Sequence, residues 1–174
     1  MADDQALIRT YGPGDASYVS YLHMKYYREH HCFKPIFEYY VMKGLSEFLN
    51  DPKGSDLWLA ETNGLVVGSI AIVKTPHAAQ LRWFLVDAEH QGKGLGRNLM
   101  NTAMYFCEEQ KYGRVFLWTV NTLKVARRLY KEFGFVLAEE KPNDEWTDDT
   151  IIEERWEMNS LNPRHCRGTS AIML

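Results

Sequence analysis

The chain has 174 residues, of which 45% are hydrophobic and 25% charged, and this size and composition are typical of one globular domain. Its 20 Lys and Arg residues and 23 Asp and Glu residues leave a net charge of −3, which argues against a general nucleic-acid binder with its usual basic excess. No apolar run reaches the roughly 18–20 residues that span a bilayer, and the acidic N-terminal sequence is unlike a secretory signal, so we expect a cytoplasmic protein with no nucleic-acid or membrane partner.

Strands and helices are predicted to alternate along most of the chain. The expected elements are a strand over 7–10, a helix from Asp15 to about 29, a helix from Pro35, strands over 57–61, 65–73 and 80–87, a helix from Leu95, a strand over 114–120, a helix over 122–132, and strands over 135–140 and 150–158. Apolar residues every three and four positions indicate the helices, and β-branched and aromatic runs indicate the strands. We expect one domain over 1–159 and a mobile tail over 160–174, which shows no period.

Three local signals refine this outline. Asp15 is the expected N-cap of the first helix, and Asn63-Gly64 favours a hairpin because both residues tolerate positive φ. The strand over 80–87 is apolar on both faces over 83–86, which is typical of a central strand covered by helices on both sides. The order β-α-α-β-β-β-α-β-α-β-β therefore predicts a single α/β domain with a mixed sheet.

The cysteines do not indicate a metal site. Cys32, Cys107 and Cys166 are widely spaced and form no Cys-x-x-Cys pair. Unpaired thiols in a reducing cytoplasm are the simplest interpretation. A metal site would also need further ligands at suitable spacing, which the sequence lacks, so we expect no metal.

Residues 85–97 carry the main functional signal. A buried strand ends there, a turn with Gly92, Gly94 and Gly96 follows, and a long helix begins. Glycines let a ligand approach the backbone, and the free N–H groups at a helix start favour phosphate. The turn is no Walker loop, because a glycine and not Ser or Thr follows Lys93, and its Gly-x-Gly-x-Gly spacing departs from the dinucleotide fingerprint.

Two motifs in this half of the chain resemble those of one superfamily. Residues 91–96 read Gln-Gly-Lys-Gly-Leu-Gly and resemble the Gln/Arg-x-x-Gly-x-Gly/Ala acetyl-CoA signature of the GNAT superfamily of N-acetyltransferases. Residues 121–135, Asn-Thr-Leu-Lys-Val-Ala-Arg-Arg-Leu-Tyr-Lys-Glu-Phe-Gly-Phe, are similar to its second signature, Asn…Ala-x-x-x-Tyr-x-x-x-Gly-Phe. The pattern Leu117-Trp-Thr119…Ala126-Arg-Arg-Leu-Tyr130 is also similar to acetyltransferase domains that are elsewhere fused to MarR-type repressors, although we expect no MarR-type DNA-binding domain here.

The resemblance implies a GNAT-like acyl-CoA N-acyltransferase fold, in which the strand over 83–86 splays from the strand over 115–120. It implies that the pantetheine arm of acetyl-CoA lies in this opening and that the pyrophosphate meets the glycine turn. The expected acetyl-CoA contacts are Phe84, Leu85, Val86, Gln91, Gly92, Lys93, Gly94, Leu95, Gly96, Arg97, Asn121 and Tyr130. The implied reaction is acetyl transfer to a primary amine by direct attack, through a tetrahedral intermediate.

The resemblance also suggests how protons move. Tyr130 is the expected general acid that protonates the leaving thiolate, and a backbone N–H near Leu85 or Val86 is the expected oxyanion donor. Glu38 is the first choice for the general base, because the second helix borders the acceptor cleft in this fold. The other candidates for the base remain open: Glu29, His30, His31, Glu61, the Gln80 and Arg82 region, and deprotonation through water.

The acceptor is left open by the sequence. The Tyr-rich stretch over 18–40, which includes Tyr27 and Tyr39, is a candidate wall for an acceptor pocket, and acidic Glu29 and Glu38 beside it would suit a cationic amine. Small amines, antibiotics, polyamines, amino acids and protein lysines or N-termini all remain open as acceptors, and the family resemblance makes a homodimer an option. A non-catalytic acyl-CoA-binding sensor or partner module is the alternative function, and a nucleotide- or phosphate-binding regulator is a third.

Overall fold

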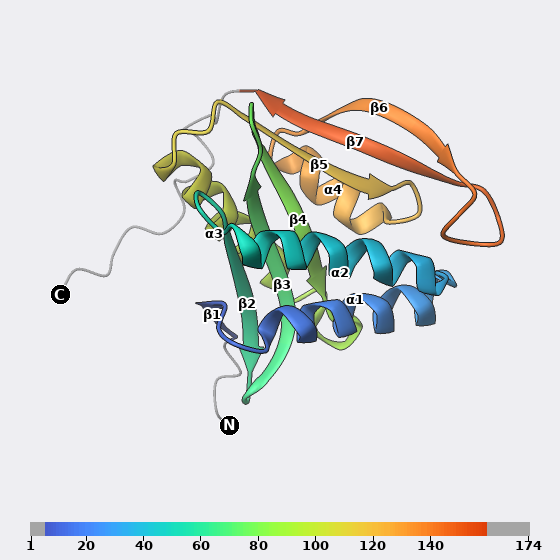
Figure 1. The fold of residues 1–174 in the computed structure, drawn as a ribbon, viewed down its shortest axis with the longest axis horizontal. Coiled ribbons are helices and arrows are strands. Elements are labelled where there is room, and N and C mark those ends of the chain that lie inside the picture. Colours follow the sequence, from blue (N-terminus) through green and yellow to red (C-terminus); the bar gives the residue numbers. More distant parts are fainter. Residues whose placement is uncertain (1–5, 160–174) are drawn as a thin grey trace.

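The computed structural model describes residues 6–159, so the expectations for the tail over 160–174 and for Cys166 lie outside the described residues. Its elements follow the expected order (Figure 1). They are β1 (Leu7–Thr10), α1 (Asp15–His31), α2 (Pro35–Asn50), β2 (Asp56–Thr62), β3 (Leu65–Lys74), β4 (Ala79–Val86), a 3-10 helix η1 (Ala88–His90), α3 (Leu95–Glu109), β5 (Arg114–Val120), α4 (Lys124–Glu132), β6 (Val136–Asn143) and β7 (Ile151–Asn159).

The strands form one seven-stranded sheet in the order β1-β2-β3-β4-β5-β7-β6. Neighbouring strands are antiparallel except for β4 and β5, which are parallel. The β2–β3 hairpin is confirmed, with Asn63 at φ 52° and Gly64 at φ 77°. The strand that is apolar on both faces, β4, is central in the sheet, as predicted.

Helices cover both faces of the sheet, with α1 and α2 side by side on one face and α3 on the other (Figure 1). Successive strand side chains point to opposite faces, and β2 shows the result. Leu57 and Leu59 pack into the core under α1 and α2, whereas Trp58 and Ala60 pack into the core that α3 and α4 cover. The fold is therefore a mixed α/β sheet between two helical layers.

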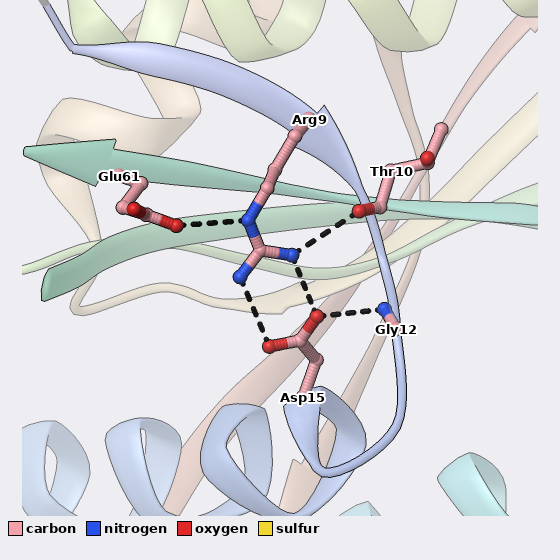
Figure 2. Close-up of polar contacts among 5 residues, drawn as sticks. All are labelled: Arg9, Thr10, Gly12, Asp15 and Glu61. Atoms are coloured by element: carbon pink, nitrogen blue, oxygen red, sulfur yellow. Dashed lines mark hydrogen bonds and ion pairs between the residues drawn. The ribbon is translucent and has the colours of Figure 1, made fainter. Parts of the chain in front are cut away.

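The start of α1 differs from the expected N-cap. Gly14, at φ 92°, is the N-cap residue and Asp15 is the first residue of the helix. The Asp15 carboxylate turns back toward β1, where it accepts hydrogen bonds from the Gly12 N–H at 2.7 Å and from two Arg9 nitrogens at 2.7 and 3.2 Å (Figure 2). Arg9 Nε also donates to Glu61 at 2.8 Å. Asp15 thus connects α1 with β1 and, through Arg9, with β2. Its carboxylate binds Arg9 and the Gly12 N–H instead of capping the free N–H groups of the helix.

We expect Asp15→Asn to lower the free energy of unfolding by roughly 1–2 kcal/mol at pH 7, because it weakens a charge-assisted pair that is only partly exposed. The Arg9 hydrogen bonds hold the pKa of Asp15 below its usual range. A lowered folded-state pKa gives stability that is present above the unfolded pKa and is lost as the pH falls through the folded value.

Urea unfolding at pH 7 and at about pH 2–3 tests this expectation. The difference between wild type and Asp15→Asn should shrink at acid pH. Asp51→Asn, at an exposed carboxylate, is the matched control and should have little effect. A difference for Asp15→Asn that stays the same at both pH values would contradict the role of the Arg9–Asp15 pair.

Within residues 6–159, no helix is both long and apolar enough to cross a membrane. The same residues contain no group of three or more His, Cys, Asp or Glu side chains placed to hold a metal ion. Cys32 and Cys107 are free thiols, the first exposed and the second buried.

Candidate active site

The parallel strands β4 and β5 are paired over only part of their length. Their partners run from Ala79 with Val115 to Leu81 with Leu117. Within the described structure, no later residue of β4 has a partner on β5. The expected opening along 83–86 is confirmed, although on β5 it begins after Leu117 and not at residue 115.

A β-bulge in β4 accompanies this opening. The register with β3 shifts between Ser69 and Ala71, where β4 carries one residue more than β3. Trp83 lies at the bulge with φ 47°, a left-handed conformation that is uncommon for a bulky residue. Leu81 and Trp83 therefore face opposite layers of the core, although strand alternation would place them on the same side. The Ser69 hydroxyl donates to the buried Trp83 carbonyl oxygen at 2.7 Å and so satisfies this acceptor.

A cavity of about 310 Å³, which we call the glycine-turn cavity, extends from the opening to the start of α3. It is lined by most of the expected acetyl-CoA contacts: Phe84, Leu85, Val86, Gln91, Gly92, Gly94, Gly96 and Arg97. Residues of α4 form its other wall. The strand end and the glycine turn, which the sequence predicts to act together, thus share one cavity.

The glycine turn presents backbone N–H groups at a helix start. Gly92 and Gly94 have φ values of 76° and 82°, and Gly94 is the N-cap of α3. The Gln91 side-chain amide donates to the Val86 carbonyl oxygen at 2.9 Å, which ties the turn to the end of β4. The first N–H groups of a helix have no acceptor within it and carry a partial positive charge. This end of the cavity therefore suits an anion.

Four expected contacts do not line the glycine-turn cavity: Lys93, Leu95, Asn121 and Tyr130, of which Tyr130 lines the neighbouring cavity described next. Lys93 is exposed, and Leu95 packs into the core beneath α3. Asn121 is bound to β7, where its N–H donates to the Ile152 carbonyl oxygen at 2.9 Å and its Oδ1 accepts from the Ile152 N–H at 3.3 Å. Their contact with acetyl-CoA stays a prediction.

A second cavity of about 310 Å³, the aromatic cavity, adjoins the first. Four residues line both: Tyr27, Phe84, Leu123 and Ala126. The polar and aromatic side chains that line the aromatic cavity are His23, Tyr27, Phe37, Tyr40, Gln80, Arg82, Trp83, Phe84, Trp118, Thr119, Tyr130, Lys141, Trp146 and Glu153. Two chambers that meet at β4 can hold two reactants side by side.

The sequence model of the acetyltransferase (GNAT) family matches residues 18–135. The chain belongs to the GNAT acetyltransferase family.

Curated relatives of this GNAT chain share about half of it. N-acetyltransferase family 8 member 3 of Rattus norvegicus is 39% identical over 87 residues, which cover 47% of this chain and 38% of that protein. N-acetylaspartate synthetase of Danio rerio is 30% identical over 96 residues, which cover 54% of this chain and 34% of that protein. The chain thus spans less than half the length of these relatives.

Solved structures share the GNAT fold over nearly the whole chain. An acetyltransferase of the GNAT family from Streptococcus pneumoniae has a TM-score of 0.70 at 20% identity and covers 89% of this chain and 99% of its own. The Salmonella typhimurium protein yncA, solved with its cofactor acetyl-CoA, has a TM-score of 0.70 at 14% identity, with coverages of 97% and 98%. At these identities the likeness establishes the fold, and it confirms the predicted fold class.

Tyr130 of this GNAT domain is buried on α4 and lines the aromatic cavity. Its ring centroid lies 6.1 Å from that of Phe84, which belongs to both cavities. Burial raises the pKa of the Tyr130 phenol, and the neighbouring Tyr27 adds to the rise. The phenol therefore stays protonated at ordinary pH, as a proton donor must.

The carboxylate that lines the aromatic cavity is that of Glu153 and not that of Glu38, the residue that the sequence favours as the base. Glu38 is half-buried in the first turn of α2 and lines neither cavity. Glu153 on β7 is only 7% exposed and lines the aromatic cavity. Its Oε1 accepts from Asn143 Nδ2 at 2.8 Å and lies 3.4 Å from Lys141 Nζ. Sequence reasoning missed Glu153, because alternation in β7 does not show which of its glutamates reaches a cavity.

Of the other base candidates, only the Gln80 and Arg82 region lines the aromatic cavity; Glu29, His30, His31 and Glu61 line neither cavity.

The Tyr-rich stretch contributes Tyr27 and Tyr40 to the wall of the aromatic cavity, whereas Tyr39 is exposed. His23 also lines the aromatic cavity, and burial lowers the pKa of its imidazole to about 4. The ring is therefore neutral near pH 7.

Proposed function

We propose that this chain transfers an acetyl group from acetyl-CoA to a primary amine. The observation that carries the proposal is the junction of the two cavities at the bulged, partly unpaired strand β4. The N-acetyltransferase names of the curated relatives and the acetyl-CoA in the yncA structure support it. One cavity takes the thioester carrier and the other takes the acceptor.

The glycine-turn cavity fits acetyl-CoA in two respects. The backbone of β4 beyond Leu81 lacks a partner on β5, and the amide groups of a pantetheine arm would satisfy it. The pyrophosphate would then meet the N–H groups at the start of α3. Arg97 and Arg128 also line the cavity; Arg97 pairs with Glu132 of the same lining, and Arg128 adds positive charge there.

In the proposed reaction, the acceptor ammonium first loses a proton to a base. The amine nitrogen then attacks the thioester carbonyl carbon from the aromatic cavity, and a backbone N–H near Leu85 or Val86 stabilises the oxyanion. The N–C bond forms and the C–S bond breaks. The leaving thiolate takes a proton from Tyr130, and the surplus proton on the nitrogen restores the phenol.

Glu153 joins Glu38 as a candidate for the base. Glu153 lines the aromatic cavity, where the acceptor is proposed to bind, and its carboxylate lies 3.4 Å from Lys141 Nζ. His23 is a weaker choice, because a pKa of about 4 makes its imidazole a poor acceptor for an ammonium proton. To separate the roles of Glu153 and Glu38, the pH dependence of kcat is compared between Glu153→Gln and Glu38→Gln.

The alternative function is an acyl-CoA-binding module without turnover. The place of Tyr130 in the acceptor cavity favours the enzyme, because a binder needs the glycine turn but no acid there.

Calorimetry with acetyl-CoA, together with thiol release onto a chromogenic disulfide across an amine panel, tests both functions. We expect acetyl-CoA to bind and thiol release to rise above the amine-free blank with at least one amine. Binding without thiol release on any amine would favour the module. No binding at all would exclude both functions.

Four expectations stay predictions: a cytoplasmic location, a homodimer, the lack of a metal, and the lack of nucleic-acid and membrane partners.

A further inference from the structure

Arg82 places a positive charge at the aromatic cavity without a matching negative charge. Within residues 6–159, its guanidinium group makes no hydrogen bond or ion pair, and it packs on the Trp83 ring, whose centroid lies 4.8 Å from Arg82 Cζ. The exposed Glu47 on α2 attracts it only from beyond ion-pair distance. A cation that is partly removed from water gains from an anionic partner.

The other charged groups of this cavity do not supply that partner. Lys141 and Glu153 pair with each other at 3.4 Å, and the Lys141 ammonium also lies 4.6 Å from the centroid of the Trp118 ring. His23 is neutral near pH 7. The charges of Lys141 and Glu153 cancel, so Arg82 leaves the lining of the cavity with a net positive charge.

Helix α2 makes room for the guanidinium group. Glycine is unfavourable inside a helix compared with alanine, yet Gly44 occupies a buried position in α2. A Cβ at this position would stand 2.9 Å from Arg82 Cζ and would clash with Nη2. The space left by the missing Cβ of Gly44 and the face of the Trp83 ring therefore hold the Arg82 guanidinium group in one position at the cavity.

We propose that Arg82 binds a carboxylate of the acceptor, so that the substrate class is a small amine that also carries a carboxylate, such as an amino acid. Arg82 and Phe84 both line the aromatic cavity, and Phe84 also lines the glycine-turn cavity, where the thioester is proposed to lie. An acceptor in the aromatic cavity would therefore meet both the guanidinium group and the junction of the cavities. A guanidinium group binds a carboxylate through two parallel hydrogen bonds.

This inference rests on the proposed N-acetyltransferase function, and paired acceptors separate the two. Phenylalanine is compared with phenylethylamine, and leucine with isopentylamine, each amine lacking only the carboxylate. In the wild type we expect kcat/KM for the carboxylated member to be higher, roughly 10- to 100-fold. In Arg82→Gln the preference should fall to near one through a higher KM, with the acetyl-CoA Kd unchanged.

Two further variants change the surroundings of Arg82 and keep its guanidinium group. Gly44→Ala should push the guanidinium group out of the space at Gly44 and so raise the KM for the carboxylated amine. Tm should not fall, because alanine is more favourable than glycine inside a helix. Glu47→Gln is the matched control, because it removes the acidic side chain that attracts Arg82 among residues 6–159. It should leave the KM unchanged or lower it.

Direct calorimetry of phenylalanine and leucine gives a readout that does not depend on turnover. Binding to the wild type that is lost in Arg82→Gln supports the inference even if no thiol is released, and in that case the proposed function alone fails. Equal kcat/KM for both members of each pair, with no effect of Arg82→Gln, would overturn the carboxylate assignment and leave the acetyltransferase standing. Absence of binding and of carboxylate preference in the wild type would also overturn it.

Discussion

Gly96→Asp is expected to lower the affinity for acetyl-CoA about 100-fold, or about 2.7 kcal/mol, while the fold is retained. Gly96 lies in the first turn of α3 and lines the glycine-turn cavity. A Cβ there would stand 3.4 Å from Phe84 Cζ, so it needs only a slight adjustment of that ring. The new carboxylate would repel the proposed pyrophosphate. It should not reduce the stability of the fold, because the partial positive charge at the helix N-terminus favours a carboxylate there.

Gly96 is a cleaner position for this test than Gly94. Gly94 has φ 82°, so any side chain there adds backbone strain to the effect of charge. Gly96→Asn is the matched control, since it has the same shape without the charge, and it should cost about tenfold or less. Calorimetric titration with acetyl-CoA at low and high salt measures both variants. Equal losses in the two variants would mean that bulk and not charge matters, and unchanged affinity in both would place the pyrophosphate elsewhere.

Tyr130→Phe is expected to lower kcat about 100-fold with little change in the KM for acetyl-CoA. The substitution removes the proposed proton donor and keeps the ring, whose centroid lies 6.1 Å from those of Phe84 and Phe135. Because burial raises the pKa of the phenol, Tyr130 keeps its proton at neutral and mildly alkaline pH. Thus the wild-type rate should show no fall from loss of this proton up to about pH 10.

Thiol release at saturating acetyl-CoA, measured from about pH 6 to 10, tests the role of Tyr130. Tyr11→Phe is the control, because Tyr11 packs on Phe48 and lines neither cavity. A kcat for Tyr130→Phe within about twofold of the wild type would rule out the acid role. A large fall in Tm for Tyr130→Phe would show that the hydroxyl supports the fold and not the reaction.

The acetyl-CoA half of the candidate site was predictable because its residues are close together in the chain. A strand end, a glycine turn and a helix start follow one another within residues 84–97, and their order alone places them around one cavity. Tyr130 followed from its spacing within the second motif. Asn121, from that same motif, instead binds Ile152 of β7, and nothing in its local sequence indicates that strand as its neighbour.

The acceptor half was not predictable in the same way. Arg82, Glu153 and Gly44 come from three separate elements, and they gather around one cavity or its edge only because α2 covers β4 and β7 pairs with β5. The bulge at Trp83 also reverses the faces of β4, so simple alternation misassigns which of its side chains reaches the cavity.

Local pattern therefore decided the order of the elements, the fold class and the family, because periodicity, turn residues and motif spacing act over a few neighbouring residues. Tertiary structure alone decided the pairing limit of β4 and β5, the contacts of Asp15 with Arg9, and the unmatched charge of Arg82. The physical reason is that a side chain's charge partner and burial depend on segments far away in the chain. Sheet order and one extra residue in a strand bring these segments together, and no single segment encodes them.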